Sequence, residues 1–253
     1  MPRKTAKKSA EPAVLRGEIA FEEGDFHALS PALASDADAN AHRLATRRKL
    51  LSLGKITIKE AGLDLECRSS LHNPNSFNSM RVRRLWAYLV RPKSAKRELK
   101  SILGSDLGKD LDAAFRNAYL CLAIEADALE VSLRIHSDAW YDGQNLTNRV
   151  AKEGLEGWLE ELNRLDGFFL RMDDWKGEWR CGELTPEKLE EFLGYYVPGE
   201  HRLTVERRWP CPSGARAHAM GVGVAEAMRS ELLRLLPLYR FTAWGPLNMH
   251  LFG

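Results

Sequence analysis

The chain has 253 residues, 44% of them hydrophobic and 28% charged, and carries a formal net charge of +2. These values are typical of a globular protein that folds without disulfide or metal staples, and they exclude wholesale disorder, collagen-like repeats and membrane-embedded classes. The small net charge hides an asymmetry: residues 1–100 carry 20 Lys and Arg against 11 Asp and Glu, whereas the remainder carries 17 against 24.

The first fourteen residues, MPRKTAKKSAEPAV, predict a disordered basic tail because they offer almost nothing to bury. No apolar run follows the tail's lysines, so a secretory leader is not expected and we place the protein in the cytoplasm. Residues 15–253 contain no long polar linker and predict one folded domain. Later apolar runs fall far short of the ~20 residues that span a bilayer, so no membrane partner is expected.

Residues 35–54 predict a helix, with Ser35 as the N-cap, Gly54 at the far end and several arginines on one face. The next segment, residues 55–71, alternates apolar and polar side chains around a glycine-containing turn. That pattern predicts a β-hairpin.

Residues 81–91 predict a strand with Trp86 and Tyr88 on one side and leucines on the other. A proline ends this strand, and a short helix is expected over residues 94–104. The clearest alternation in the chain, residues 117–136, predicts a hairpin near the middle of a sheet.

The remaining pattern predicts, in order, two helices broken near Gly154, a hairpin over 167–180, a helix capped by Thr185, a strand over 201–210 and a last helix over 223–236. Strands that arrive as hairpins with helices between them favour an α+β fold. We therefore expect one domain in which a mostly antiparallel sheet packs with helices.

The most basic stretch is residues 81–100, which hold eight Lys and Arg against a single Glu. Lysine and arginine neutralise phosphates and aromatic rings stack on bases, so nucleic acid is the expected partner of a non-enzymatic or accessory protein. With two residues of the preceding helix, the predicted nucleic-acid-binding set is Arg47, Arg48, Arg81, Arg83, Arg84, Arg91, Lys93, Lys96, Arg97 and Lys100. Alternatively, these groups pair with the acidic remainder of the chain and the aromatic residues lie in the core, or the partner is another protein.

An enzyme is the rival hypothesis, although the sequence carries none of the standard catalytic or phosphate-binding motifs. His136, Asp142 and Asn145 follow the predicted hairpin, where a strand passes into a helix and polar groups often face a pocket. His136 and Asp142 suit a general base and its orienting carboxylate, acting on a small anionic substrate. In the simpler interpretation, Ser137 caps the helix and His136 is a satisfied boundary residue.

The sequence predicts no metal and no cofactor. Four widely spaced cysteines without a C-x-x-C pair argue against zinc and predict free, buried thiols. One acidic cluster has the oxygen ligands that Mg²⁺ prefers, and it comprises Asp173, Asp174, Glu178 and Glu183. Acidic side chains in a glycine-containing turn are usually only solvated. A nuclease site built on Asp127, Glu130 and Arg134 lacks a nearby lysine, and the GVGVAEAM segment from Gly221 lacks the third glycine of a phosphate-binding turn.

Several short motifs occur in a fixed order along the chain. Phe21, Asp25 and Phe26 form F-x-x-x-D-F, an arginine-rich helix follows, H-N-P at residues 72–74 precedes the aromatic strand, and LLPLY occupies residues 235–239. In these features the chain resembles the YktB-like family of bacterial proteins, whose function is uncharacterised. The resemblance implies a single α/β domain and supplies no functional residues.

Overall fold

The expected strands form one antiparallel sheet. The computed structural model describes residues 19–69, 81–173, 177–211 and 222–252, so the predicted tail, residues 1–14, lies outside it. Within these residues the sheet has seven strands in the order β1-β2-β3-β4-β7-β5-β6, with all neighbours antiparallel. In chain order the strands are β1 Glu66–Ser69, β2 Arg84–Val90, β3 Tyr119–Glu125, β4 Ala128–Ile135, β5 Phe169–Met172, β6 Trp179–Arg180 and β7 Leu203–Pro210.

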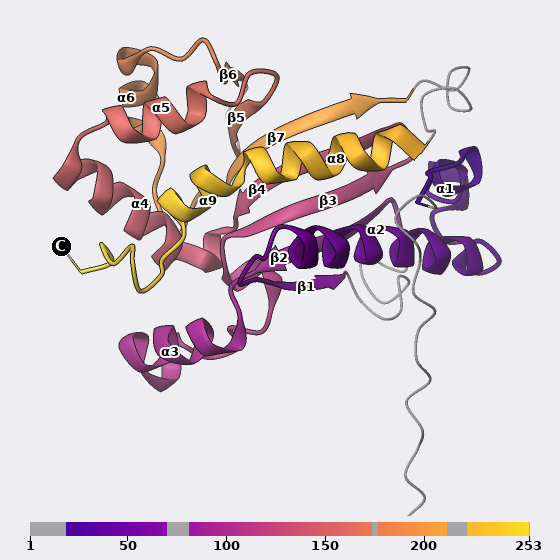
Figure 1. Cartoon of the computed structure of the whole chain (residues 1–253), viewed down its shortest axis with the longest axis horizontal. Coiled ribbons are helices and arrows are strands. Elements are labelled where there is room, and N and C mark those ends of the chain that lie inside the picture. The colour runs from indigo at the N-terminus through magenta and orange to yellow at the C-terminus, as the bar shows by residue number, and fades with distance from the viewer. Residues whose placement is uncertain (1–18, 70–80, 174–176, 212–221, 253) are drawn as a thin grey trace, which may run out of the picture.

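Helices α2 and α8 lie side by side across one face of the sheet, and α9 continues the line of α8 (Figure 1). Helices α4, α5 and α6 gather at one end of the sheet. The helices are α1 Glu23–His27, α2 Asn40–Glu60, α3 Lys93–Leu107, α4 Trp140–Glu153, α5 Glu156–Asn163, α6 Pro186–Tyr195, α8 Val222–Arg234 and α9 Leu236–Thr242, with 3-10 turns η1 Pro31–Leu33, η2 Ala114–Arg116 and η3 Ser137–Ala139. In the described part of the chain, no helix combines the length and apolar character that crossing a bilayer requires. The α+β prediction is confirmed.

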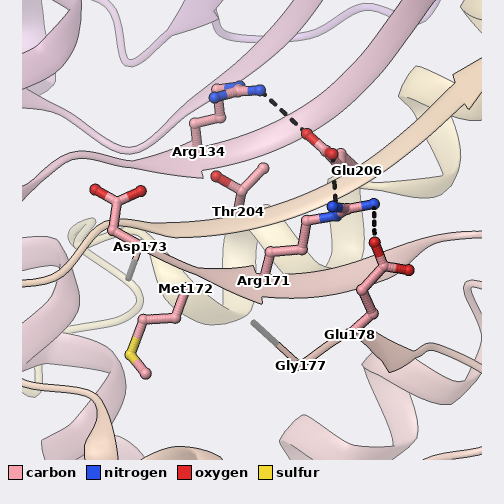
Figure 2. A pocket seen from close by; sticks show the side chains of 8 residues that line it. All are labelled: Arg134, Arg171, Met172, Asp173, Gly177, Glu178, Thr204 and Glu206. Carbon is pink, nitrogen blue, oxygen red and sulfur yellow. Dashed lines mark hydrogen bonds and ion pairs between the residues drawn. The ribbon is translucent and has the colours of Figure 1, made fainter. Parts of the chain in front are cut away.

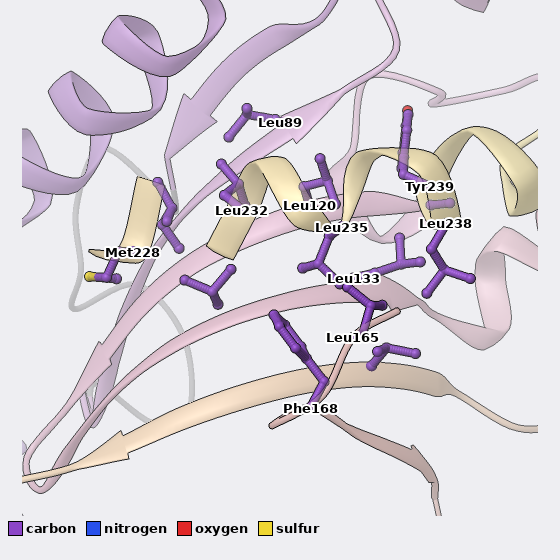
Figure 3. Packing of buried hydrophobic residues seen from close by; sticks show 14 of the residues in the cluster. Leu89, Leu120, Leu133, Leu165, Phe168, Met228, Leu232, Leu235, Leu238 and Tyr239 are labelled. Atoms are coloured by element: carbon purple, nitrogen blue, oxygen red, sulfur yellow. The ribbon is translucent and has the colours of Figure 1, made fainter. Parts of the chain in front are cut away.

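The main core lies between the sheet and the helices on it. Alternation along β2, β3 and β4 directs Leu89, Leu120 and Leu133 toward the helices, where they meet Leu232 and Leu235 (Figure 3). All five side chains are almost completely buried. Burial of a leucine contributes roughly 2 kcal/mol, so this layer fixes which sheet face points inward.

The predicted hairpin over residues 55–71 is wrong, because α2 runs through Gly54 to Glu60 and only β1 follows it. Gly54 does not end the helix. A Cβ at this position would lie 2.5 Å from the Sγ atom of Cys67, so glycine allows β1 to approach α2. Ser35 is also not the N-cap, since α2 begins at Asn40.

Other local predictions are confirmed. Strands β3 and β4 form the central hairpin, Gly154 separates α4 from α5 with a φ of 92°, and Thr185 caps α6 by accepting a hydrogen bond from the Lys188 amide. Helix α3 continues past its predicted end at Gly104, whose φ of 84° produces a kink. The four cysteines are free thiols, of which Cys67 is half-buried and the others are buried.

Candidate binding site on the polar face of the sheet

The sheet face opposite α2 and α8 carries charged and aromatic side chains, and we call it the polar face. Its residues alternate along each strand with those of the core, so one strand pattern builds both surfaces. The polar face comprises Arg84, Trp86, Tyr88, Tyr119, Cys121, Glu125, Glu130, Ser132, Arg134, Phe169, Arg171, Thr204, Glu206 and Arg208.

The strand register arranges these side chains in rows. Tyr119 lies opposite Arg134, Arg134 opposite Thr204, and Thr204 opposite Arg171. Neighbouring strands are about 4.8 Å apart, so this row extends roughly 14 Å across β3, β4, β7 and β5. The register thus aligns an aromatic ring, two arginines and a hydroxyl that are distant in the sequence.

Glu130 is the centre of an ionic network on this face. Its two carboxylate oxygens accept hydrogen bonds from Arg84 at 2.7 and 2.8 Å, and one of them also accepts from Arg134 at 2.7 Å. Arg208 lies 3.3 Å away, and its other nitrogen binds Glu125 at 2.8 Å. The network links β2, β3, β4 and β7 by their side chains.

Burial and the neighbouring charges shift the pKa of the Glu130 carboxyl group in opposite directions, and this residue is only 2% exposed. Burial favours the protonated form, but the hydrogen bonds and charge of Arg84, with the charge of Arg134, outweigh it and hold the pKa far below its usual value. Glu130 is therefore ionised and held by arginines.

Glu206 lies between two arginines from different strands (Figure 2). Its carboxylate is 3.2 Å from Arg134 on β4 and 3.1 Å from Arg171 on β5. Arg171 also binds Glu178 at 2.8 Å. Burial, with the charge of Glu130, raises the pKa of Glu206 although Arg134, Arg171 and Arg208 oppose the rise. Glu206 therefore takes up a proton more readily than an ordinary glutamate.

Among the described residues, two pockets open on the polar face, and Arg134 lines both. We call the larger one, of about 270 Å³, the anion pocket; its lining includes Arg134, Arg171, Asp173, Glu178, Thr204 and Glu206 (Figure 2). The second, of about 180 Å³, is called the aromatic pocket and is lined by Arg84, Trp86, Tyr119, Cys121 and Arg134. Burial raises the pKa of the Cys121 thiol, so this sulfur is a wall of the pocket rather than a nucleophile.

The predicted nucleic-acid-binding residues do not share one surface. Arg84 belongs to the Glu130 network, Arg91 is buried against Asp142, and Lys96 lies 3.3 Å from Asp112. Arg47 is half-buried and also interacts with another group of the protein. The exposed members are Arg48, Arg81, Arg83, Lys93, Arg97 and Lys100.

The exposed residues of the 81–100 tract lie at opposite ends of β2. Arg83 precedes the strand and Lys93 follows it. Strand β2 has seven residues and rises about 3.3 Å per residue, so its two ends are separated by roughly 20 Å. The tract is divided into two basic regions.

The three candidate catalytic residues have different surroundings. His136 is partly exposed, lies 3.0 Å from Asp138 and caps η3, the role expected of Ser137. Asp142 is fully buried, where it binds Arg91 and accepts hydrogen bonds from the backbone amides of Ala118 and Trp244. Its carboxylate therefore ties α4 to three segments of the chain.

Asn145 is equally buried. Its side chain donates to the Thr242 carbonyl and accepts from the His250 amide, which fastens the end of the chain to α4. The structure thus places Asp142 and Asn145 among internal contacts and leaves His136 at the surface. Burial, with the charge of Arg202, lowers the pKa of His136, while Asp138 and Asp173 act against it. Asp173 lines the anion pocket, whereas His136 is not among its lining residues.

The described acidic residues of the proposed Mg²⁺ cluster each bind a different arginine. Asp173 lies 3.2 Å from Arg202, and Glu183 lies 3.2 Å from Arg180, while Glu178 binds Arg171. Within the described residues, no group of three or more His, Cys, Asp or Glu side chains is placed to hold a metal ion. Asp174 and Gly221 fall outside the described residues.

Sequence reasoning considered Glu130 and Arg134 only as nuclease residues, and it missed Glu206 and Arg171. The signal was present in β4, where Glu130, Ser132 and Arg134 alternate with apolar residues in the middle of a predicted sheet. Three polar side chains on one side of a central strand indicate a sheet with one face turned away from the core.

Comparison with known proteins adds no assignment: no protein-family model matches the chain, and no curated protein matches it either. The resemblance to the YktB-like family stays a prediction.

Proposed function

We propose that the protein binds a small ligand through an anionic group, which enters the anion pocket between Arg134 and Arg171. The observation that supports this most directly is the convergence of these two arginines, from β4 and β5, on the single buried carboxylate of Glu206. The planar guanidinium group of arginine matches carboxylate and phosphate oxygens, and an anion on the ligand uses the same donors.

The charge balance of the face favours a small ligand over a long polyanion. Among the described residues, the face together with Asp173, Glu178 and Arg202 at its edge holds five arginines and five acidic side chains in ion pairs: Arg84, Arg134, Arg171, Arg202 and Arg208 with Asp173, Glu125, Glu130, Glu178 and Glu206. A neutral network attracts a phosphate chain weakly, because such binding depends on excess positive charge. The pocket volume of about 270 Å³ lies near the lower end of small-ligand sites.

Protonation of Glu206 would offset the negative charge that a bound anion brings into the pocket. Its pKa is already raised by burial and by Glu130, and a negative group beside it would raise that pKa further. When Glu206 binds a proton, the two arginines face one negative charge fewer. The lining of the pocket, with two arginines against Asp173 and Glu178, then becomes neutral instead of negative, and the ten-group network carries a net charge of +1.

Calorimetric titration of the full chain with sulfate at pH 6 tests this proposal. We expect saturable binding that weakens at least tenfold in Arg171→Gln. Arg180→Gln is the matched control, since Arg180 is an exposed arginine on the neighbouring strand β6, and it should bind sulfate as the wild type does. Undetectable binding, or equal binding by both variants, contradicts the proposal.

A second proposal is nucleic-acid binding by the two basic regions at the ends of β2, supported by the exposure of Arg83 and Arg97. Gel shifts with single-stranded DNA over a range of salt concentrations test it. We expect affinity that falls as salt rises and falls further after charge reversal of either arginine. Absence of binding at low salt, or binding indifferent to both reversals, contradicts this second proposal.

A further inference from the structure

The aromatic pocket adjoins the anion pocket, and Arg134 forms part of the wall of both. Tyr119 lies directly opposite Arg134 in the strand register. Trp86 comes from β2 and lies opposite Ala123, four residues along β3 from Tyr119, and both side chains line the aromatic pocket. Both rings are only partly buried, whereas the alternate residues of the same strands, such as Leu85 and Leu120, are fully enclosed. Two partly exposed rings on a rigid sheet provide a surface on which another ring can stack.

We infer that the ligand of the proposed site is a planar aromatic ring joined to an anionic group, with the ring against Trp86 and Tyr119 and the anion between Arg134 and Arg171. This inference rests on the proposed function and adds the class of ligand. A stacked ring contributes roughly 1–3 kcal/mol in comparable aromatic sites.

The spacing between Tyr119, the nearer ring of the aromatic pocket, and the two arginines agrees with a ligand of this kind. The midpoint of Arg134 and Arg171 falls on β7 at Thr204, which is two strands from Tyr119. Two strand spacings are about 10 Å. Nucleoside monophosphates and aromatic amino acids both combine a ring with an anionic group, and the longer connection of a nucleotide fits this spacing better.

The polar groups around the rings add selectivity for a heteroaromatic ring. Arg84 lines the aromatic pocket and is fixed there by two hydrogen bonds to Glu130 and one to Glu125. A guanidinium group held in this way, with its other terminal nitrogen also directed at the Cys121 sulfur, presents its plane in a fixed orientation. A heteroaromatic ring meets both the aromatic surface and this charged plane.

The test compares calorimetric titrations of the full chain with adenosine monophosphate, tryptophan and ribose 5-phosphate, which has the anion without the ring. At least one ring-bearing compound should bind ten or more times as tightly as ribose 5-phosphate. Trp86→Leu should remove that advantage and leave the ribose 5-phosphate affinity unchanged, whereas Trp86→Phe, which keeps a ring, should retain most of it. Trp140→Leu is the control, because Trp140 is a partly buried tryptophan that packs against a separate hydrophobic cluster.

The possible results distinguish the inference about the aromatic ring from the proposal that the anion pocket binds an anion. Binding of adenosine monophosphate or tryptophan with the expected response to Trp86→Leu supports the inference and identifies the source of the ring. Binding of all three compounds with equal affinity overturns the inference and leaves the anion pocket standing. Ring-bearing ligands that bind equally well to wild type and Arg171→Gln overturn both, as does the absence of any binding.

Discussion

Glu130 accepts hydrogen bonds from arginines on β2, β4 and β7, so one carboxylate holds the side chains of three strands together. Ser132 adds a further hydrogen bond at 2.7 Å. A buried charge of this kind is costly to leave without partners, and the arginines around it would repel one another in its absence. The polar face therefore depends on this residue for its geometry.

Glu130→Gln should lower the free energy of unfolding at pH 7 by about 3 kcal/mol, because it removes the buried charge to which three partly buried arginines are paired. The folded-state pKa of Glu130 is depressed, so its ionised form stabilises the protein above the unfolded pKa of about 4.3 and this contribution fades as pH falls. Urea unfolding at pH 7 and pH 4 measures both effects. The variant should lose less stability than the wild type between these pH values.

Glu183→Gln serves as the control for that measurement, since Glu183 is an exposed partner of Arg180. Its stability should stay within about 0.5 kcal/mol of the wild type. A Glu130→Gln protein as stable as this control would show that the network contributes nothing.

Glu206 predicts a pH dependence of anion binding. The groups acting on it are Arg134 and Glu130 from β4, Arg171 from β5 and Arg208 on its own strand. Since its pKa is raised and a bound anion raises it further, binding takes up a proton and sulfate affinity should increase as pH falls from 8 to 5. In Glu206→Gln, sulfate should bind more tightly at pH 8 and with a flatter pH profile. Calorimetry across this range checks it, and parallel profiles for the two proteins contradict it.

Among the elements, α2 shows where local pattern and tertiary packing disagree. The KITIKE segment alternates like a strand, yet Ile56 and Ile58 pack against the core as part of a helix. Gly54 lies within that helix where β1 approaches most closely. The close approach of Cys67 and Leu89 explains why a glycine stands within this helix.

Gly54→Ala tests that contact. The new methyl group would overlap the Cys67 Sγ atom, so the variant should lose about 1–3 kcal/mol of unfolding free energy although alanine is the better helix former. The double variant Gly54→Ala/Cys67→Ala removes the sulfur and should recover most of the loss. Thermal and urea unfolding of both variants and of Cys67→Ala alone measure the coupling. A single Gly54→Ala variant as stable as the wild type contradicts the close approach.

The difference between local pattern and long-range contact also explains why only part of the site could be predicted from the sequence. The β3–β4 hairpin and the α6 cap could be predicted because their signals lie within a few adjacent residues. The pairing of β7 between β4 and β5 could not, since it joins β7 to β4 across about 70 residues and to β5 across about 35 residues without a local signal. Arg134, Glu206 and Arg171 meet only through that pairing, so the anion pocket follows from topology.

At the scale of the whole molecule, the two faces of the sheet have different roles. Helices α2 and α8 cover one face and form the core, while the other presents the Glu130 network and the two pockets. Part of the charge asymmetry along the chain is neutralised by ion pairs within the fold. Arg84 and Arg91 from the basic part bind Glu130 and Asp142 from the acidic part, as the alternative interpretation of the basic tract expected.

The most direct test of the central proposal, anion binding between Arg134 and Arg171, is a crystal structure determined from crystals of the full chain that have been soaked with selenate at pH 6. Selenate is a tetrahedral anion whose anomalous signal locates it independently of the surrounding density. We predict an anomalous peak between Arg134 and Arg171, with Glu206 within contact distance. Selenate bound elsewhere on the molecule, with none in the anion pocket at saturating concentration, would contradict the proposal.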